Sequence, residues 1–137
     1  MKTAVVYYSM TGNTEQMAQT LKDSIGDNCD IFEVSETRAS NIAKYESIAL
    51  GCPAMGDEVL EEGDFEPFFE ELLPLLKNQK VALFGSYDWG DGQWMRDWEE
   101  KCKSNGVKLV LESVIANLEG DEQTLTQLKD LGKSLSN

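Results

Sequence analysis

Histidine is absent from this sequence of 137 residues. The chain therefore lacks the commonest general base, the commonest metal ligand and the usual activator of serine and cysteine nucleophiles. Cysteine is scarce as well, since Cys29, Cys52 and Cys102 stand far apart and form no Cys-x-x-Cys motif. We expect three buried thiols rather than a disulfide framework or a zinc site, and self-contained hydrolytic catalysis is disfavoured.

Long hydrophobic runs and positive charge are also in short supply. The first apolar stretch covers only residues 4–8, which is too short for a signal-peptide core or a membrane span, so we expect a cytoplasmic protein. Lys and Arg number 12 against 25 Asp and Glu, which gives a formal net charge of −13. This charge would repel nucleic acids and anionic membranes, so the expected macromolecular partners are basic faces of other proteins.

What the sequence does contain is a regular alternation of strand-like and helix-like segments. Runs rich in β-branched and aromatic residues predict five strands, at about residues 2–8, 29–33, 47–51, 80–85 and 108–115. The chain shows no linker and no internal repeat, and its length suits one domain, residues 1–137. We expect the α/β class, with a five-stranded parallel sheet flanked by helices on both faces.

The spacing of apolar residues places the helices between these strands. Met17, Leu21 and Ile25 recur four residues apart, which predicts a first helix that stops at Gly26. A short second helix is expected at residues 39–45, and a third opens near Pro67 and is kinked or ended by Pro74. The apolar face of the fourth helix consists of Trp94, Met95, Trp98 and Cys102. The apolar face of the last helix consists of Leu125, Leu128, Leu131 and Leu135.

In open α/β sheets, ligands bind beyond the carboxyl ends of the strands, so the loops after the first, third and fourth strands are candidates for a site. The first loop packs hydroxyls, an amide and a glycine between a strand and a helix start: Ser9, Met10, Thr11, Gly12, Asn13 and Thr14. Free N–H groups and the positive end of the helix dipole suit a phosphate there. Alternatively, Asn13 and Gln16 form a capping box and bind nothing.

The loops after the third and fourth strands carry groups suited to a flat ring. The earlier loop holds Pro53, Ala54, Met55, Gly56, Asp57 and Glu58, and the later one Ser86, Tyr87, Asp88, Trp89 and Gly90. Met55 offers a polarizable side chain, Gly56 a freely rotating backbone and Trp89 a stacking face. The alternatives are that Met55 belongs to the core, Gly56 is a turn residue and Trp89 covers the rim of the core. Together the three loops indicate a flat, phosphorylated cofactor.

These three loops resemble those of the flavodoxin family. The phosphate loop of that family is similar to Ser9-x-Thr11-Gly12-Asn13-Thr14, and its two flavin-flanking loops are similar to Met55-Gly56-Asp57-Glu58 and Phe84-Gly85-Ser86-Tyr87-x-Trp89-Gly90. The similarity covers nearly the whole chain, without the inserted loop of long-chain members. It implies a flavodoxin-like three-layer sandwich that binds flavin mononucleotide (FMN). Such a protein is a monomeric, low-potential one-electron carrier that cycles between semiquinone and hydroquinone, not an enzyme.

The resemblance also implies roles for individual residues. The phosphate would be held by neighbouring amides together with Ser9, Thr11, Asn13 and Thr14. The isoalloxazine ring would lie between Met55 and Trp89, and the Gly56–Asp57 peptide would turn its carbonyl toward flavin N5 on reduction. The ring N3–H would be bound by Glu58. The pyrimidine edge of the ring would meet the backbone at Asp88 and Trp89, and the ribityl chain would contact Asn117. The same loop also carries Ser86, Tyr87 and Gly90, which are counted with the cofactor-binding residues.

Three residues depart from the family pattern. Met10 stands where glycine is common, Pro53 where some relatives have a phosphate-touching serine, and Asp88 where glycine usually precedes the tryptophan. Asp88 either brings a carboxylate to the flavin edge, where it would affect redox tuning, or serves as a turn residue that tolerates left-handed backbone.

Other classes with this architecture fit the residues less well. An FMN-dependent reductase, such as a quinone reductase, is the main alternative, although 137 residues leave little chain for a second pocket. A response-regulator receiver needs acids where Tyr8-Ser9 and Gly51-Cys52 stand, and a low-molecular-weight phosphatase needs a Cys-x-x-x-x-x-Arg motif that is absent. The acidic segment 57–71, which contains no base, is either a solvated face or a docking surface for basic partners.

Overall fold

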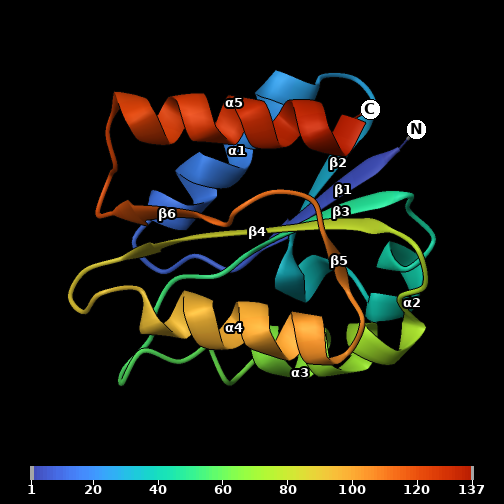
Figure 1. Cartoon of the computed structure of the whole chain (residues 1–137), viewed down its shortest axis with the longest axis horizontal. Coiled ribbons are helices and arrows are strands. Elements are labelled where there is room, and N and C mark those ends of the chain that lie inside the picture. The colour runs from blue at the N-terminus through green and yellow to red at the C-terminus, as the bar shows by residue number, and fades with distance from the viewer. Residues whose placement is uncertain (1, 137) are drawn as a thin grey trace.

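The computed structural model describes residues 2–136, and a parallel β-sheet lies between two layers of helices (Figure 1). Helices α1 (Asn13–Ile25) and α5 (Glu122–Ser136) cover one face of the sheet. The other face is covered by α2 (Ala39–Ile42), α3 (Phe65–Leu72) and α4 (Gln93–Ser104). The predicted α/β class and three-layer arrangement are therefore confirmed.

All pairs of neighbouring strands in the sheet are parallel, in the order β2-β1-β3-β4, with β5 and β6 both paired to β4. The strands are β1 (Thr3–Tyr7), β2 (Cys29–Glu33), β3 (Ser47–Gly51), β4 (Lys80–Tyr87), β5 (Lys108–Leu109) and β6 (Val114–Asn117). The predicted bounds of β2 and β3 agree with the structure, and β4 runs two residues further than expected. Because every strand points the same way, the carboxyl ends of β1, β3 and β4 meet at one edge.

The continuous strand predicted at residues 108–115 is wrong, because the chain leaves the sheet between β5 and β6. Val110 still donates its N–H to the Val81 carbonyl at 3.0 Å, but Leu111 is exposed and Ser113 turns toward α4. The Ser113 hydroxyl donates to Glu99 Oε2 at 2.7 Å. Ser113 is therefore hydrogen-bonded to a helix and not to a strand. As a result, the described sheet has six strands, where five were predicted.

Two hydrophobic cores hold the layers together, one on each face of the sheet. On one face Val5 and Ala49 pack with Leu21 and Leu128 of the covering helices. The core on the other face contains four fully buried aromatic side chains, Phe65, Phe69, Trp94 and Trp98. The Trp98 ring meets the two phenylalanines edge-on, at 5.5 Å from Phe65 and 5.9 Å from Phe69. The predicted apolar helix faces are confirmed apart from Leu125, which is exposed near the start of α5.

The three cysteines are buried free thiols, as predicted. Burial raises the pKa of Cys29 to about 11 and the pKa values of Cys52 and Cys102 to about 12. All three thiols therefore stay protonated at neutral pH and lack the thiolate that redox or nucleophilic chemistry requires. No helix within residues 2–136 combines the length and the apolar character needed to cross a bilayer.

The helix predicted to open near Pro67 begins at Phe65, because a carboxylate from the preceding loop caps it. The Glu61 carboxylate accepts from the N–H groups of Gly63, Asp64 and Phe65 at 2.7–2.8 Å. Burial pushes the pKa of this carboxyl up, but the three N–H donors outweigh burial and hold it below its ordinary value of 4.5. At the other end Pro74 converts the last turn into a 3₁₀ helix, η2 (Leu73–Leu75).

Two smaller features of this face differ from expectation. The second helix, α2, is shorter than the predicted 39–45, and an unpredicted 3₁₀ turn, η1 (Val34–Glu36), precedes it. The η1 turn is held by a reciprocal capping box between Glu33 and Glu36.

Replacement of the capping carboxylate, Glu61→Ala, should lower the free energy of unfolding of the flavin-free protein by about 1–2 kcal/mol at pH 7. Because the folded pKa is lowered, this contribution is complete above pH 4.5 and is lost as the pH falls through the folded pKa. Denaturant unfolding at pH 7 and pH 3 measures the difference. The exposed neighbour Glu62 provides the control, since Glu62→Ala should change little at either pH. An effect of Glu61→Ala that is equal at both pH values would contradict the capping role.

Candidate functional site

A pocket of about 430 Å³ lies where the three predicted loops meet, at the carboxyl ends of β1, β3 and β4. Thirteen of the predicted site residues line it, together with Leu118, which follows β6: Ser9, Met10, Thr11, Asn13, Thr14, Pro53, Ala54, Met55, Gly56, Ser86, Tyr87, Asp88 and Trp89. Three loops that are far apart in the sequence therefore converge on one cavity. The sheet topology alone brings them together.

The loop before α1 presents free hydrogen-bond donors at the start of a helix. Gly12, in left-handed backbone with a φ of 100°, is the N-cap and has no side chain of its own to cap the helix. The predicted alternative, a capping box of Asn13 and Gln16, is therefore wrong. Ser9 Oγ accepts from the N–H groups of Gly12 and Glu15 at 3.2 Å. Within residues 2–136 the N–H groups of Asn13 and Thr14 have no partner, and with the positive end of the helix dipole they fit a phosphate.

A buried hydroxyl pair joins this loop to the loop after β4. The hydroxyls of Thr14 and Ser86 lie 2.7 Å apart, and the Ser86 N–H donates to Thr14 Oγ1 at 3.3 Å. Both side chains are almost fully buried. The first helical turn of α1 is thus fixed relative to the end of β4.

The loops after β3 and β4 are held by hydrogen bonds to backbone carbonyls. The N–H of Ala54 donates to the Ser86 carbonyl at 3.0 Å, and the Trp94 indole N–H donates to the Cys52 carbonyl at 3.1 Å. A side chain at Gly85 has no room, because a Cβ there would stand 2.2 Å from the Cys52 carbonyl oxygen. Glycine at this position lets the two backbones approach each other, directly before the lining residues Pro53 and Ser86.

Met55 and Trp89 stand on the two loops that wall the pocket. Met55 is half-buried and Trp89 is 61% exposed, so the alternatives that placed Met55 in the core and Trp89 over the core rim are wrong. Met55 and Val59 exchange backbone hydrogen bonds of 2.9 and 3.0 Å across a tight turn in which Gly56 has a φ of 48°. A large exposed aromatic and a thioether at the mouth of a pocket fit a flat ring.

Five predicted site residues lie outside the pocket lining, and the contacts of two of them are with protein. The five residues outside the lining are Gly12, Asp57, Glu58, Gly90 and Asn117. Glu58 Oε1 accepts from the N–H groups of Gly92 and Gln93 at the start of α4. Asn117 Nδ2 donates to the carbonyls of Tyr87 and Asp88, both at 3.3 Å. These two side chains hold the loop after β4 in place, and their implied flavin contacts remain predictions.

Two residues at the pocket, Asp88 and Leu118, differ from the sequence-based expectations. Asp88 is exposed at the pocket, and its backbone is not left-handed, so its alternative role as a left-handed turn residue is wrong. Leu118 was not predicted as a site residue, and the only sequence signal for it was its position next to Asn117. It has a φ of 55°, donates its N–H to the Tyr87 carbonyl at 2.8 Å and is 49% exposed.

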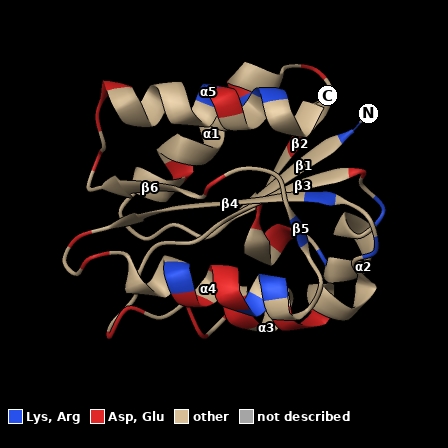
Figure 2. Cartoon of the chain, in the orientation of Figure 1, with Lys and Arg blue, Asp and Glu red and all other residues tan. Residues whose placement is uncertain are grey.

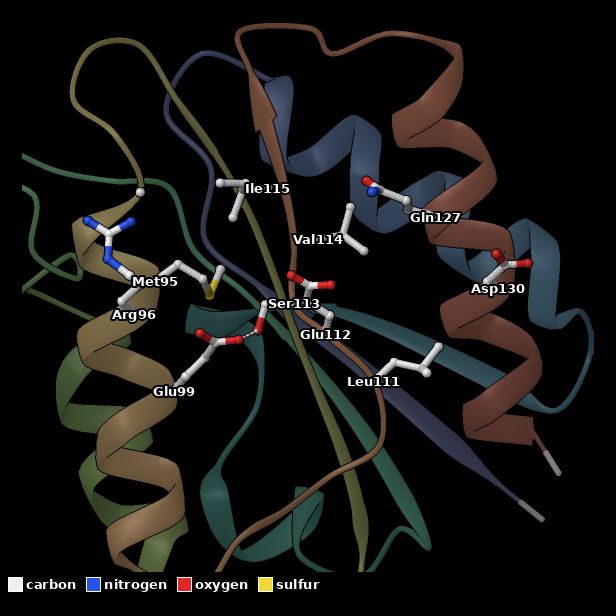
Figure 3. Close-up of a pocket in the computed structure, with 11 residues that line it drawn as sticks. Met95, Arg96, Glu99, Leu111, Glu112, Ser113, Val114, Ile115, Gln127 and Asp130 are labelled. Carbon is white, nitrogen blue, oxygen red and sulfur yellow. Dashed lines mark hydrogen bonds between the residues drawn. The ribbon is translucent and has the colours of Figure 1, made fainter.

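A second cavity, of about 450 Å³, lies away from these loops, between α4, α5 and the β5–β6 connection (Figure 3). Its walls include Met95 and Glu99 of α4 and Asp130 of α5, and the Glu99–Ser113 hydrogen bond crosses it. None of the predicted site residues lines this cavity. The cavity at the three loops is therefore the candidate functional site.

Comparison with known proteins identifies the family. A family model described as flavodoxin matches residues 5–132. Flavodoxin from Clostridium beijerinckii is 43% identical over 136 residues, covering 97% of this chain and 98% of the relative, and flavodoxin from Megasphaera elsdenii is 37% identical over 133 residues, covering 95% of each. The solution structure of two-electron reduced Megasphaera elsdenii flavodoxin has a TM-score of 0.86 at 36% identity and covers 98% of both chains. This protein belongs to the flavodoxin family.

Proposed function

We propose that the pocket between the three loops holds one FMN and that the protein carries electrons, one at a time, between redox proteins. Flavodoxins are FMN-bound electron carriers rather than enzymes. The observation that supports the site is the pocket itself, since one cavity of about 430 Å³ joins the unpaired N–H groups of α1 to Met55 and Trp89. The FMN-dependent reductase alternative is less well supported, because the curated relatives that match nearly full length are flavodoxins.

The loop before α1 would bind the phosphate through neutral donors. No Lys or Arg occurs between Thr3 and Gln19, so no basic side chain from the loop can contribute. The proposed donors to the phosphate are the Thr11 hydroxyl and the N–H groups of Asn13 and Thr14. Ser9 Oγ already accepts two N–H groups, which leaves its hydroxyl hydrogen free to donate to a phosphate oxygen.

The other two loops would bind the ring. The Met55 thioether and the Trp89 indole would contact its two faces and exclude water from them. FMN when bound accepts and releases single electrons. The Gly56 peptide would hold a carbonyl near the ring nitrogen that gains a proton, and Asp88 would place an exposed negative charge at the pocket, which disfavours further negative charge on the ring.

Charge is distributed unevenly between the two ends of the sheet, and this supports basic redox proteins as partners (Figure 2). Lys2, Lys80 and Lys108 lie at the amino ends of strands, far from the pocket. The loops at the pocket end carry mainly acids, and Arg96 at this end pairs with Asp91 at 3.0 Å. A basic partner would therefore meet the pocket end first.

We also propose that the protein is a monomer, is cytoplasmic and acts as a single domain. A net charge of −13 opposes self-association, which supports a monomer. Three buried free thiols suit a reducing compartment, which supports a cytoplasmic location. All described strands belong to one sheet, which supports action as a single domain.

The phosphate role predicts that FMN binds at least about 100-fold more tightly than riboflavin, because several hydrogen bonds to a charged group are lost with the phosphate. Ser9→Ala should narrow this ratio by about tenfold. Fluorescence titration of the flavin-free protein with both flavins measures it. Ser40→Ala, which removes an exposed hydroxyl far from the pocket, should leave the ratio unchanged. Equal affinity of the wild-type protein for both flavins would refute the proposed phosphate site.

The turn at Gly56 predicts a redox effect of a β-branched residue. Gly56→Val should bring the two one-electron potentials of the bound FMN closer together, because a φ of 48° is strained for valine and the peptide cannot rotate freely. Potentiometric titration measures both potentials. Gly106→Val is the control, since Gly106 has a φ of 75° and an equally open surrounding but lies far from the pocket. An unchanged separation of potentials in Gly56→Val would rule out a role for peptide rotation.

The charge distribution predicts how association depends on salt. Reduction of the protein by a basic redox protein should slow as ionic strength rises. At low salt Glu62→Lys, near the pocket end, should slow association several-fold more than Asp27→Lys, which makes the same change of net charge at the opposite end. Stopped-flow measurement gives these rates. Equal effects of the two variants would show that net charge alone matters and would exclude docking at the pocket end.

A further inference from the structure

The Glu58 side chain connects the two loops that wall the pocket, the loop after β3 and the loop after β4. Its backbone belongs to the turn that carries Met55, and its carboxylate reaches the loop that carries Trp89. Glu58 Oε1 accepts from the N–H of Gly92 at 3.2 Å and from the N–H of Gln93 at 3.0 Å. A residue 34 positions earlier in the chain thereby caps helix α4.

Helix α4 lacks any other side-chain cap. Its N-cap is Gly92, which has no side chain, and its first residue is Gln93. The first N–H groups of a helix need an acceptor, and a negative charge at this end is stabilised by the helix dipole. The Glu58 carboxylate supplies both the acceptor and the charge.

Two further features of the structure are arranged around this contact. Glu58 has a φ of 57°, a left-handed conformation that is uncommon for a residue with a side chain. Gly90 lies directly against the carboxylate, since a Cβ at Gly90 would stand 2.5 Å from Glu58 Cδ. The left-handed backbone at one end and the missing side chain at the other both permit the carboxylate to reach α4.

We propose that Glu58 is a positioning residue that sets the width of the FMN site by tying the Met55 turn to the start of α4. The proposal rests on the proposed function, in which FMN lies between Met55 and Trp89. Both hydrogen bonds join Oε1 to backbone N–H groups of the protein, so the tie does not require contact with the ring. A role through the ring N3–H, which the family resemblance implies, is the competing explanation.

The first test measures the tie in the flavin-free protein. In Glu58→Ala the amides of Gly92 and Gln93 should exchange with solvent deuterium about tenfold faster, the size of one hydrogen bond to a charged group. Glu58→Gln keeps an acceptor oxygen and should restore most of the protection. Asp57→Ala removes the same charge from the adjacent exposed residue and should leave both amides unchanged. Equal exchange in wild type and Glu58→Ala would overturn the proposal.

The second test separates positioning from direct contact with the ring. Affinity is measured for FMN and for FMN methylated at N3, which has no N3–H to donate. The proposal predicts that Glu58→Ala weakens binding of both flavins by about the same factor, about tenfold. A loss seen with FMN alone would assign Glu58 to the ring and overturn the positioning role. Should the wild-type protein bind neither flavin, the proposed function would fail, while amide exchange would still decide whether Glu58 makes the tie.

Discussion

The geometry of the site depends on how closely the backbones of β3 and β4 approach at their carboxyl ends. Gly85 meets the Cys52 carbonyl where no Cβ fits, and Ala54 and Ser86 continue the contact by a backbone hydrogen bond. The buried Thr14–Ser86 hydroxyl pair then fixes α1 to the same point. Because buried polar groups without partners are costly, these bonds give each loop a single position relative to the others. The shape of the pocket is therefore held by contacts within the protein itself.

The proposed recognition of the phosphate by neutral donors would have an electrostatic consequence for the rest of the molecule. The loop before α1 offers N–H groups and hydroxyls without a lysine or arginine, so the pocket end gains no positive charge from it. A bound phosphate would add negative charge to an end that is already acidic. Under this proposal, the loops at this end would keep their negative charge for the docking of a basic partner.

The acidic segment after β3 has structural duties besides any part in docking. Glu61 caps α3 and Glu58 caps α4, so two of its carboxylates stabilise helix starts. Glu62, in contrast, is exposed and free to interact with a partner. The two explanations of this segment, structure and docking, therefore apply to different residues within it.

Local sequence patterns determined the fold class, the positions of β2 and β3 and the three loops that form the pocket, because alternating apolar periods and loop composition are local properties. The sequence also marked Met55 and Trp89, since exposed apolar groups in polar loops are unusual. It could not separate β5 from β6, because the Ser113–Glu99 hydrogen bond that accompanies the break joins segments distant in the chain. Only the tertiary structure decided that Glu58 reaches α4, that Asn117 holds the loop after β4 and that Leu118 lines the pocket, since each depends on contacts between segments that meet only when the sheet has formed.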